Sequence, residues 1–105
     1  MIKLSAIANE RDSFSNIPLK YDLHQNYPNP FNPITTITYD IIKLQNVEVT
    51  IYDILGREIK SLVNDQQQPG SYTIKWDASN VSSGVYFYQL KTKDYINTKK
   101  MILLK

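Results

Sequence analysis

Short runs rich in Val, Ile, Thr and Tyr recur from residue 21 onward, and Pro, Gly, Asn and Asp residues separate them. In the clearest run, residues 35–41, the apolar side chains of Ile37, Tyr39 and Ile41 alternate with polar ones. Alternate residues of a β-strand point to opposite faces, so this pattern indicates a strand with one buried face. Because no run keeps a helical period, the sequence predicts an all-β fold.

The runs are nearly evenly spaced, and they predict strands at residues 21–25, 35–41, 47–52, 57–63, 71–76, 84–92 and 96–104. About seven short antiparallel strands at this spacing are typical of an immunoglobulin-like two-sheet β-sandwich. Residues 84–92 are apolar on both faces, which favours a central position in a sheet. The polar residues 64–70 are predicted to form a surface loop.

Glycines mark the predicted turns. Gly56 is expected to take a positive φ in a hairpin turn, which a residue without a Cβ does easily. The segments 70–72 and 84–86 share a Gly-x-Tyr spacing. We interpret this as the same local structure, used in both places to lead from a turn into a strand. The second segment also resembles the tyrosine corner of immunoglobulin-like domains, and Tyr88 then takes the place of their cysteine. The chain has no cysteine, so aromatic packing must replace the disulfide.

The segment Tyr27-Pro28-Asn29-Pro30-Phe31-Asn32-Pro33 excludes a central strand, because its three prolines lack backbone N–H donors. We interpret it as a stiff connector that places Phe31 in the core. The alternative is a polyproline ligand for another protein.

A chain of 105 residues has the length of one domain. We assign residues 21–105 to that domain and residues 1–20 to a linker or mobile lead-in. The apolar run after Met1 is broken by Ser5, which argues against a signal peptide. No stretch approaches the roughly 20 apolar residues of a membrane span, and we expect a monomer without one.

The formal net charge is +2, so the sequence gives no reason to expect a nucleic-acid partner. The positive charge is concentrated after residue 90, where five lysines accompany one aspartate. We interpret residues 99–105 as a final edge strand whose lysines hinder aggregation, or as a basic and apolar tag that a receptor reads.

Catalytic groups are scarce. His24 is the single histidine, there is no cysteine, and the carboxylates are dispersed along the sequence. We therefore expect no enzyme and no cofactor, and we interpret His24 as a surface or packing residue rather than a metal ligand. A calcium ion between turn aspartates stays open as an alternative.

Taken in order, several motifs resemble the type A C-terminal sorting domain of the type IX secretion system. They are residues 23–33 (LHQNYPNPFNP), 35–39 (TTITY), 51–57 (IYDILGR), 76–77 (WD), 83–88 (SGVYFY) and 99–105 (KKMILLK). The resemblance covers residues 21–105, and the proline-rich block is its most specific part. The same strands also resemble the immunoglobulin-like domain of the flagellar hook-capping protein.

This resemblance implies a non-catalytic domain that directs an upstream cargo in the same polypeptide across the outer membrane. Its partners would be the translocon and a surface sortase that attaches the cargo, and its location would be secreted or at the cell surface, by way of the periplasm. The resemblance implies recognition through five residues: Lys99, Lys100, Leu103, Leu104 and Lys105. It implies a fold-defining role for another six: Tyr27, Phe31, Gly56, Trp76, Gly84 and Tyr86.

Two points stay open in the sequence. Residues 41–46 lack the Leu-Pro pair and the glycine that the family often has there, so the conformation of this loop is not predicted. The alternative function is a carbohydrate- or protein-binding accessory module of a secreted enzyme. Exposed aromatic side chains among Tyr52, Tyr72, Tyr88 and Tyr95 would then form its binding platform.

Overall fold

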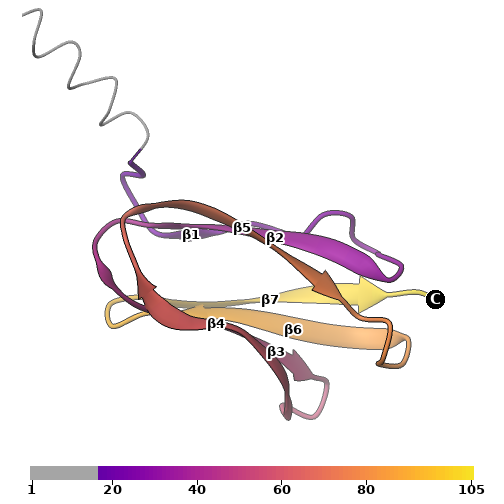
Figure 1. Cartoon of the computed structure of the whole chain (residues 1–105). Helices are drawn as coiled ribbons and strands as arrows, with labels where there is room; N and C mark the ends of the chain where they lie inside the picture. The colour runs from indigo at the N-terminus through magenta and orange to yellow at the C-terminus, as the bar shows by residue number, and fades with distance from the viewer. Residues whose placement is uncertain (1–16) are drawn as a thin grey trace, which may run out of the picture.

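A computed structural model of the chain describes residues 17–105, which form two facing antiparallel β-sheets (Figure 1). The three-stranded sheet has the order β1 (Asp22–Leu23), β2 (Ile34–Ile41) and β5 (Gly70–Asp77). The four-stranded sheet has the order β4 (Glu58–Gln67), β3 (Gln45–Asp53), β6 (Gly84–Lys91) and β7 (Ile96–Leu103). The predicted all-β sandwich of seven strands is confirmed.

The chain before β1 is only partly described. Residues 1–16, most of the predicted lead-in, lie outside the described residues, and residues 17–20 belong to no strand. Within residues 17–105, no helix is long and apolar enough to cross a bilayer.

The core lies between the sheets and follows the alternation seen in the sequence. In β2, every second residue from Thr35 to Ile41 is buried, and the residues between them are partly exposed. The buried apolar residues come from both sheets and from the turns that close them: Leu23, Phe31, Ile37, Tyr39, Ile41, Val47, Val49, Ile51, Trp76, Ala78, Tyr86, Tyr88, Leu90, Met101 and Leu103.

Strand β4 is longer than the sequence predicts. The polar residues 64–67, which we predicted as loop, pair in register with residues 45–48 of β3, so that prediction is wrong. The strand lies at the edge of its sheet, and most of its side chains are exposed. Residues 64–67 are therefore held in the strand by backbone pairing to β3. They have no apolar face, so the sequence pattern does not indicate a strand there.

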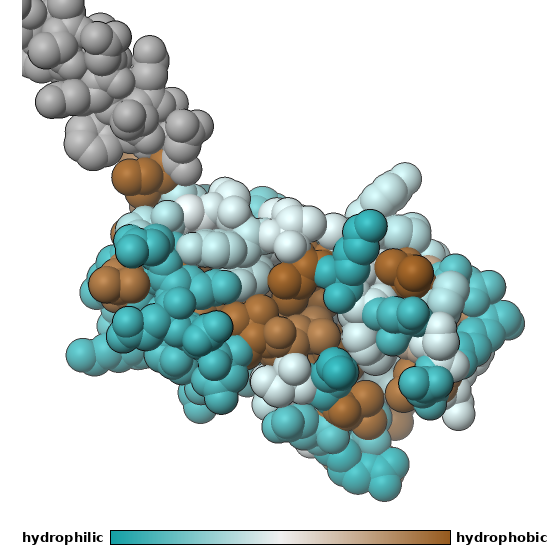
Figure 2. All heavy atoms as spheres, in the orientation of Figure 1, coloured by the Kyte–Doolittle hydropathy of each residue, from teal (hydrophilic) through white to brown (hydrophobic). Residues whose placement is uncertain are grey.

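The sandwich is open along the side where β4 and β5 form the edges of their sheets. Figure 2 shows apolar side chains gathered in the middle of this face. Here Ile59 and Leu62 of β4 line a hollow together with Trp76 of β5 and Val81 of the following turn.

The turn before β4 forms as predicted. Gly56 has φ 82°, and its amide donates to the carbonyl of Asp53 at 3.0 Å. The Asp53 carboxylate also accepts from the amides of Leu55 and Arg57 at 2.9 Å each, and from the Arg57 Nε at 2.8 Å. These bonds, led by the Arg57 amide, lower the pKa of Asp53.

The two Gly-x-Tyr segments have the same geometry. The Tyr72 hydroxyl donates to the carbonyl of Gln68 at 2.7 Å, and the Tyr86 hydroxyl donates to the carbonyl of Ser82 at 2.6 Å. In both cases the acceptor precedes the tyrosine by four residues. The predicted local reuse is confirmed, and Tyr86 forms a tyrosine corner.

The turn between β2 and β3, whose conformation the sequence left open, is fixed against the turn between β6 and β7. The Lys43 ammonium lies 2.7 Å from the Asp94 carboxylate, and this hydrogen bond lowers the pKa of Asp94. Next to this pair the rings of Tyr21 and Tyr95 stack at 5.1 Å, and the Tyr21 hydroxyl accepts from Gln45 at 2.7 Å. One end of the sandwich is closed in this way.

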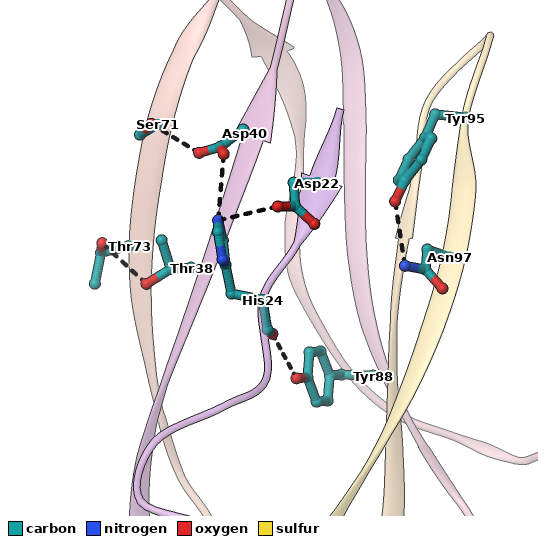
Figure 3. Close-up of polar contacts among 9 residues, drawn as sticks. All are labelled: Asp22, His24, Thr38, Asp40, Ser71, Thr73, Tyr88, Tyr95 and Asn97. Carbon is teal, nitrogen blue, oxygen red and sulfur yellow. Dashed lines mark hydrogen bonds and ion pairs between the residues drawn. The ribbon is translucent and has the colours of Figure 1, made fainter. Parts of the chain in front are cut away.

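Strand β6 lies between β3 and β7, as its two apolar faces predict, and it places Tyr88 in the core. The Tyr88 hydroxyl donates to the carbonyl of His24 and accepts from the amide of Asn26, both at 2.7 Å. It therefore ties the chain after β1, which belongs to the opposite sheet, to the middle of the four-stranded sheet (Figure 3).

We predict that Tyr88→Phe lowers the free energy of unfolding by about 1–3 kcal/mol, because the Asn26 amide and the His24 carbonyl lose a buried partner. The matched control is Tyr52→Phe, whose ring is partly exposed on β3 and should cost less than about 0.5 kcal/mol. Urea unfolding followed by circular dichroism measures both. Equal costs would contradict the structural role given to the Tyr88 hydroxyl.

We also predict that the domain loses stability at high pH. Burial raises the pKa of Tyr39 and of Tyr88 from 10.0 to about 12. The folded state keeps both hydroxyls neutral, whereas the unfolded chain ionises them near pH 10.0. Their contribution to the free energy of unfolding is therefore complete below pH 10.0 and is lost as the pH rises toward about 12. Unfolding midpoints should decline over that interval, and tyrosinate absorbance should show a late-ionising fraction. Titration of all eight tyrosines in one step near pH 10.0 would contradict it.

Candidate functional site

Strand β7 and the residues after it combine the basic and apolar character that the sequence analysis singled out. β7 pairs with β6 along one edge, with Lys99 opposite Tyr88 and Leu103 opposite Gly84. The side chains of Met101 and Leu103 point into the core and are 0% exposed. Lys100 and Ile102, which alternate with them, face outward. The strand therefore contributes to the core on one face and presents a lysine on the other.

The C-terminal end of the other edge of β7 is occupied by the proline-rich segment, residues 26–33, which connects β1 to β2 (Figure 1). The Phe31 amide donates to the carbonyl of Ile102 at 2.9 Å, and the Leu104 amide donates to the carbonyl of Phe31 at 3.0 Å. The Asn29 Oδ1 accepts from the Ile102 amide at 2.9 Å. These bonds satisfy the polar backbone groups that an edge strand normally exposes.

The same segment also pairs with the opposite sheet. The backbones of Tyr27 and Thr36 of β2 exchange two hydrogen bonds of 2.9 Å. Four residues later, Phe31 packs against Trp76 at a ring distance of 5.8 Å, and Trp76 in turn meets Tyr86 edge-on at 5.6 Å. The proline-rich segment therefore joins β2 to β7 and closes that side of the sandwich.

The tail after β7, Leu104 and Lys105, lies on the surface and is held there by hydrogen bonds. The Lys105 amide donates to the Ser83 Oγ at 3.0 Å, and its ammonium donates to the carbonyl of Ser79 at 2.7 Å. The positive charge of Lys105 contributes, after the hydrogen bonds from Ser79, to a lowered pKa of Asp77. The side chain of Leu104 is exposed over 57% of its surface.

The five residues expected to mediate recognition fall into two groups. Lys100, Leu104 and Lys105 are exposed and Lys99 is partly exposed, so the side chains of these four residues are accessible on the folded domain. Leu103 is fully buried among core residues. A partner contacts Leu103 only if the end of β7 leaves the sandwich.

The six residues expected to define the fold are placed differently from one another. Phe31, Trp76 and Tyr86 are 2%, 4% and 7% exposed and form the aromatic cluster beneath the end of β7. Gly56 forms the positive-φ turn, and Gly84 begins β6. Tyr27 is 78% exposed, and what it contributes to the fold is its backbone pairing with Thr36.

Sequence reasoning missed Asn26, the only buried side-chain amide among residues 17–105. Its Nδ2 donates to the Thr35 Oγ1 at 2.9 Å and to the carbonyl of Pro28 at 3.1 Å. It holds the start of the proline-rich segment to β2. The sequence signal for this role was the position of the asparagine directly before a turn rich in proline. Asparagine side chains at such positions often form hydrogen bonds with nearby backbone groups.

Two expectations about surface groups need correction. Tyr88 is fully buried, so it is no part of an exposed aromatic platform, and Tyr52, Tyr72 and Tyr95 are only partly exposed. The carboxylates are not all dispersed, because Asp22 and Asp40 both lie beside His24 on the outer face of the three-stranded sheet. Strand pairing brings together residues that are far apart in the sequence.

Residues 25–104 match the family described as secretion system C-terminal sorting domain, and the chain belongs to this family. Such domains mark proteins that type IX secretion carries across the outer membrane to the cell surface or the extracellular space. A comparison with curated proteins found no match.

Among solved structures, the chain is similar to PorZ, described as an essential bacterial surface component of the type IX secretion system of human oral-microbiomic Porphyromonas gingivalis. The identity is 22% and the TM-score 0.54, over 81% of this chain and 11% of the PorZ chain. At this identity the likeness shows a shared fold. The chain spans only a small part of PorZ.

We predict that Asn29→Ala accelerates hydrogen exchange of the Ile102 amide, because that amide loses its side-chain acceptor on the outer edge of β7. The matched control is Asn32→Ala, an exposed asparagine of the same segment. NMR-detected exchange at the amides of Val85 and Phe87 in β6, which lie opposite Ile102 and Lys100, should change little. An unchanged rate at Ile102 in Asn29→Ala would contradict the proposed pairing.

Proposed function

We propose that the domain is a non-catalytic sorting domain whose solvent-accessible residues at the end of β7 and directly after it are bound by the type IX outer-membrane translocon. The residues assigned to this contact are Lys99, Lys100, Leu104 and Lys105, with Leu103 as a core residue that becomes available if the strand end is released. An upstream cargo in the same polypeptide is carried along, and a surface sortase then removes the domain and attaches the cargo.

Membership in the sorting-domain family is the observation that carries this proposal. The placement of the tail supports it, since Leu104 is 57% exposed and stands next to Lys105, which is exposed as well. An exposed apolar side chain beside lysines suits a partner that offers an apolar pocket with acidic groups at its rim. The non-catalytic role rests on the sequence, which has one histidine and no cysteine.

Removing residues 99–105 is a poor test, because it also removes Met101 and Leu103 from the core. Large-to-small changes at such sites cost about 2–5 kcal/mol each, so a truncated domain would fail through unfolding. Substitutions on the exposed side chains separate recognition from stability.

We predict that the double variant Leu104→Ser/Lys105→Gln blocks export of a reporter fused before the 105-residue chain in a bacterium with type IX secretion. The matched control is Ile96→Ser/Lys93→Gln, which changes an apolar residue that is 60% exposed at the start of β7 and a lysine in the turn before that strand. Immunoblots of medium, cell surface and periplasm measure the distribution, and thermal melting shows that both variants fold.

The unmodified fusion should leave the periplasm, and the control variant should follow it. Retention of the unmodified fusion in the periplasm would overturn the sorting proposal. Export of the tail variant at the level of the control would overturn the assignment of the tail as the recognised part. Sortase processing predicts that the surface-bound reporter is smaller than the fusion by the mass of the domain.

A further inference from the structure

Three side chains with metal-binding groups converge on the outer face of the three-stranded sheet. Asp22 of β1 pairs in register with Asp40 of β2, and His24 follows Asp22 by two residues, so all three side chains point to the same face (Figure 3). The donor atoms of the three residues lie within 4.8 Å of one another. Nothing in the proposed sorting function uses this cluster.

The spacing of the donor atoms is close to what one bound cation requires. The His24 Nε2 lies 3.2 Å from the Asp40 Oδ2 and 3.8 Å from the Asp22 Oδ2. A tetrahedral cation with bonds of about 2.0–2.1 Å separates its ligands by about 3.4 Å. Binding therefore requires the Asp22 carboxylate, whose side chain is 41% exposed, to move closer to the other two donor atoms.

The surroundings hold two of the three ligands in place. The Ser71 hydroxyl donates to the Asp40 Oδ1 at 2.7 Å, which leaves the Oδ2 turned toward His24 (Figure 3). The His24 backbone is fixed on both sides, because its amide donates to the carbonyl of Thr38 at 3.0 Å and its carbonyl accepts from the Tyr88 hydroxyl at 2.7 Å. Outer partners of this kind orient the ligands of metal sites.

The kind of cation follows from the donor set. Ca²⁺ prefers six to eight oxygen ligands, whereas an imidazole nitrogen with two carboxylates suits Zn²⁺ and neighbouring transition metals. Two carboxylates also balance the charge of a divalent cation. We propose that Asp22, His24 and Asp40 form a site for a divalent transition-metal cation, Zn²⁺ foremost, with the fourth position open to solvent or to a further ligand.

Such a cation would link β1 to β2. β1 has only two residues, and it leads directly into the proline-rich segment that holds β7. Binding to the folded state alone stabilises it by mass action, so the cation would fix the shortest strand of the sandwich. The effect does not depend on whether the domain directs secretion.

The test is a calorimetric titration of the untagged, chelator-treated chain with zinc chloride at neutral pH, with calcium chloride as the comparison. The chain has a single histidine, so nitrogen ligation reports on one residue. We expect one Zn²⁺ per chain, a higher melting temperature with Zn²⁺, and weaker binding of Ca²⁺. Cobalt chloride should give the intense visible bands of a low-coordinate nitrogen and oxygen site.

The variants His24→Gln and Asp22→Asn should each weaken Zn²⁺ binding more than tenfold. Asp22→Asn keeps the hydrogen bond between His24 and Asp40, and melting without metal shows that both variants fold. The control Asp65→Asn changes an exposed carboxylate of β4 and should bind as the unmodified chain does. Failure to saturate at one Zn²⁺ per chain, equal affinity in His24→Gln, or tighter binding of Ca²⁺ would overturn the proposal.

Discussion

The backbone pairing between the proline-rich segment and the outer edge of β7 holds the sandwich together at the place where its function is expected. Without it, the end of the last strand would keep only β6 as a neighbour and would expose the backbone groups of Ile102 and the amide of Leu104. Phe31 anchors the segment in the core, and Tyr27 bonds it to β2. Since prolines lack the N–H that a further strand would need, the segment covers this edge without extending the sheet.

Tyrosine hydroxyls take over cross-links that a disulfide provides in other immunoglobulin-like domains. Tyr88 occupies the position that holds a cysteine in antibody domains. Its hydroxyl makes hydrogen bonds to two backbone groups of the chain that follows β1. Tyr39 spans the sandwich in the same way, donating from β2 to the Gln67 side chain at 2.6 Å. A hydrogen bond requires a defined distance and angle, whereas apolar contacts do not. A buried hydroxyl that is hydrogen-bonded therefore fixes how the two sheets pack against each other. The fold therefore needs no oxidising compartment to form its links.

The two sides of the sandwich differ. The side between β2 and β7 is closed by the proline-rich segment, whereas the side between β4 and β5 leaves an apolar hollow (Figure 2). The surface tail leaves from the closed side, where the aromatic cluster of Phe31, Trp76 and Tyr86 supports it. The tail is therefore exposed on a domain whose core is packed beneath it, and the tail is the part to which the proposed function assigns recognition.

The residue pattern alone predicts the strands with one buried face, the central place of β6 and the glycine turn at residue 56, because alternation and backbone sterics act over a few neighbouring residues. Its motifs were also sufficient to identify the family. It did not reveal the polar half of β4, the burial of Asn26 and Leu103, or the meeting of Asp22 and Asp40 at His24. Each of these features depends on which strands are neighbours, and neighbours are set by tertiary pairing between distant segments. The alternation of residues within one strand does not reveal which strand pairs with it.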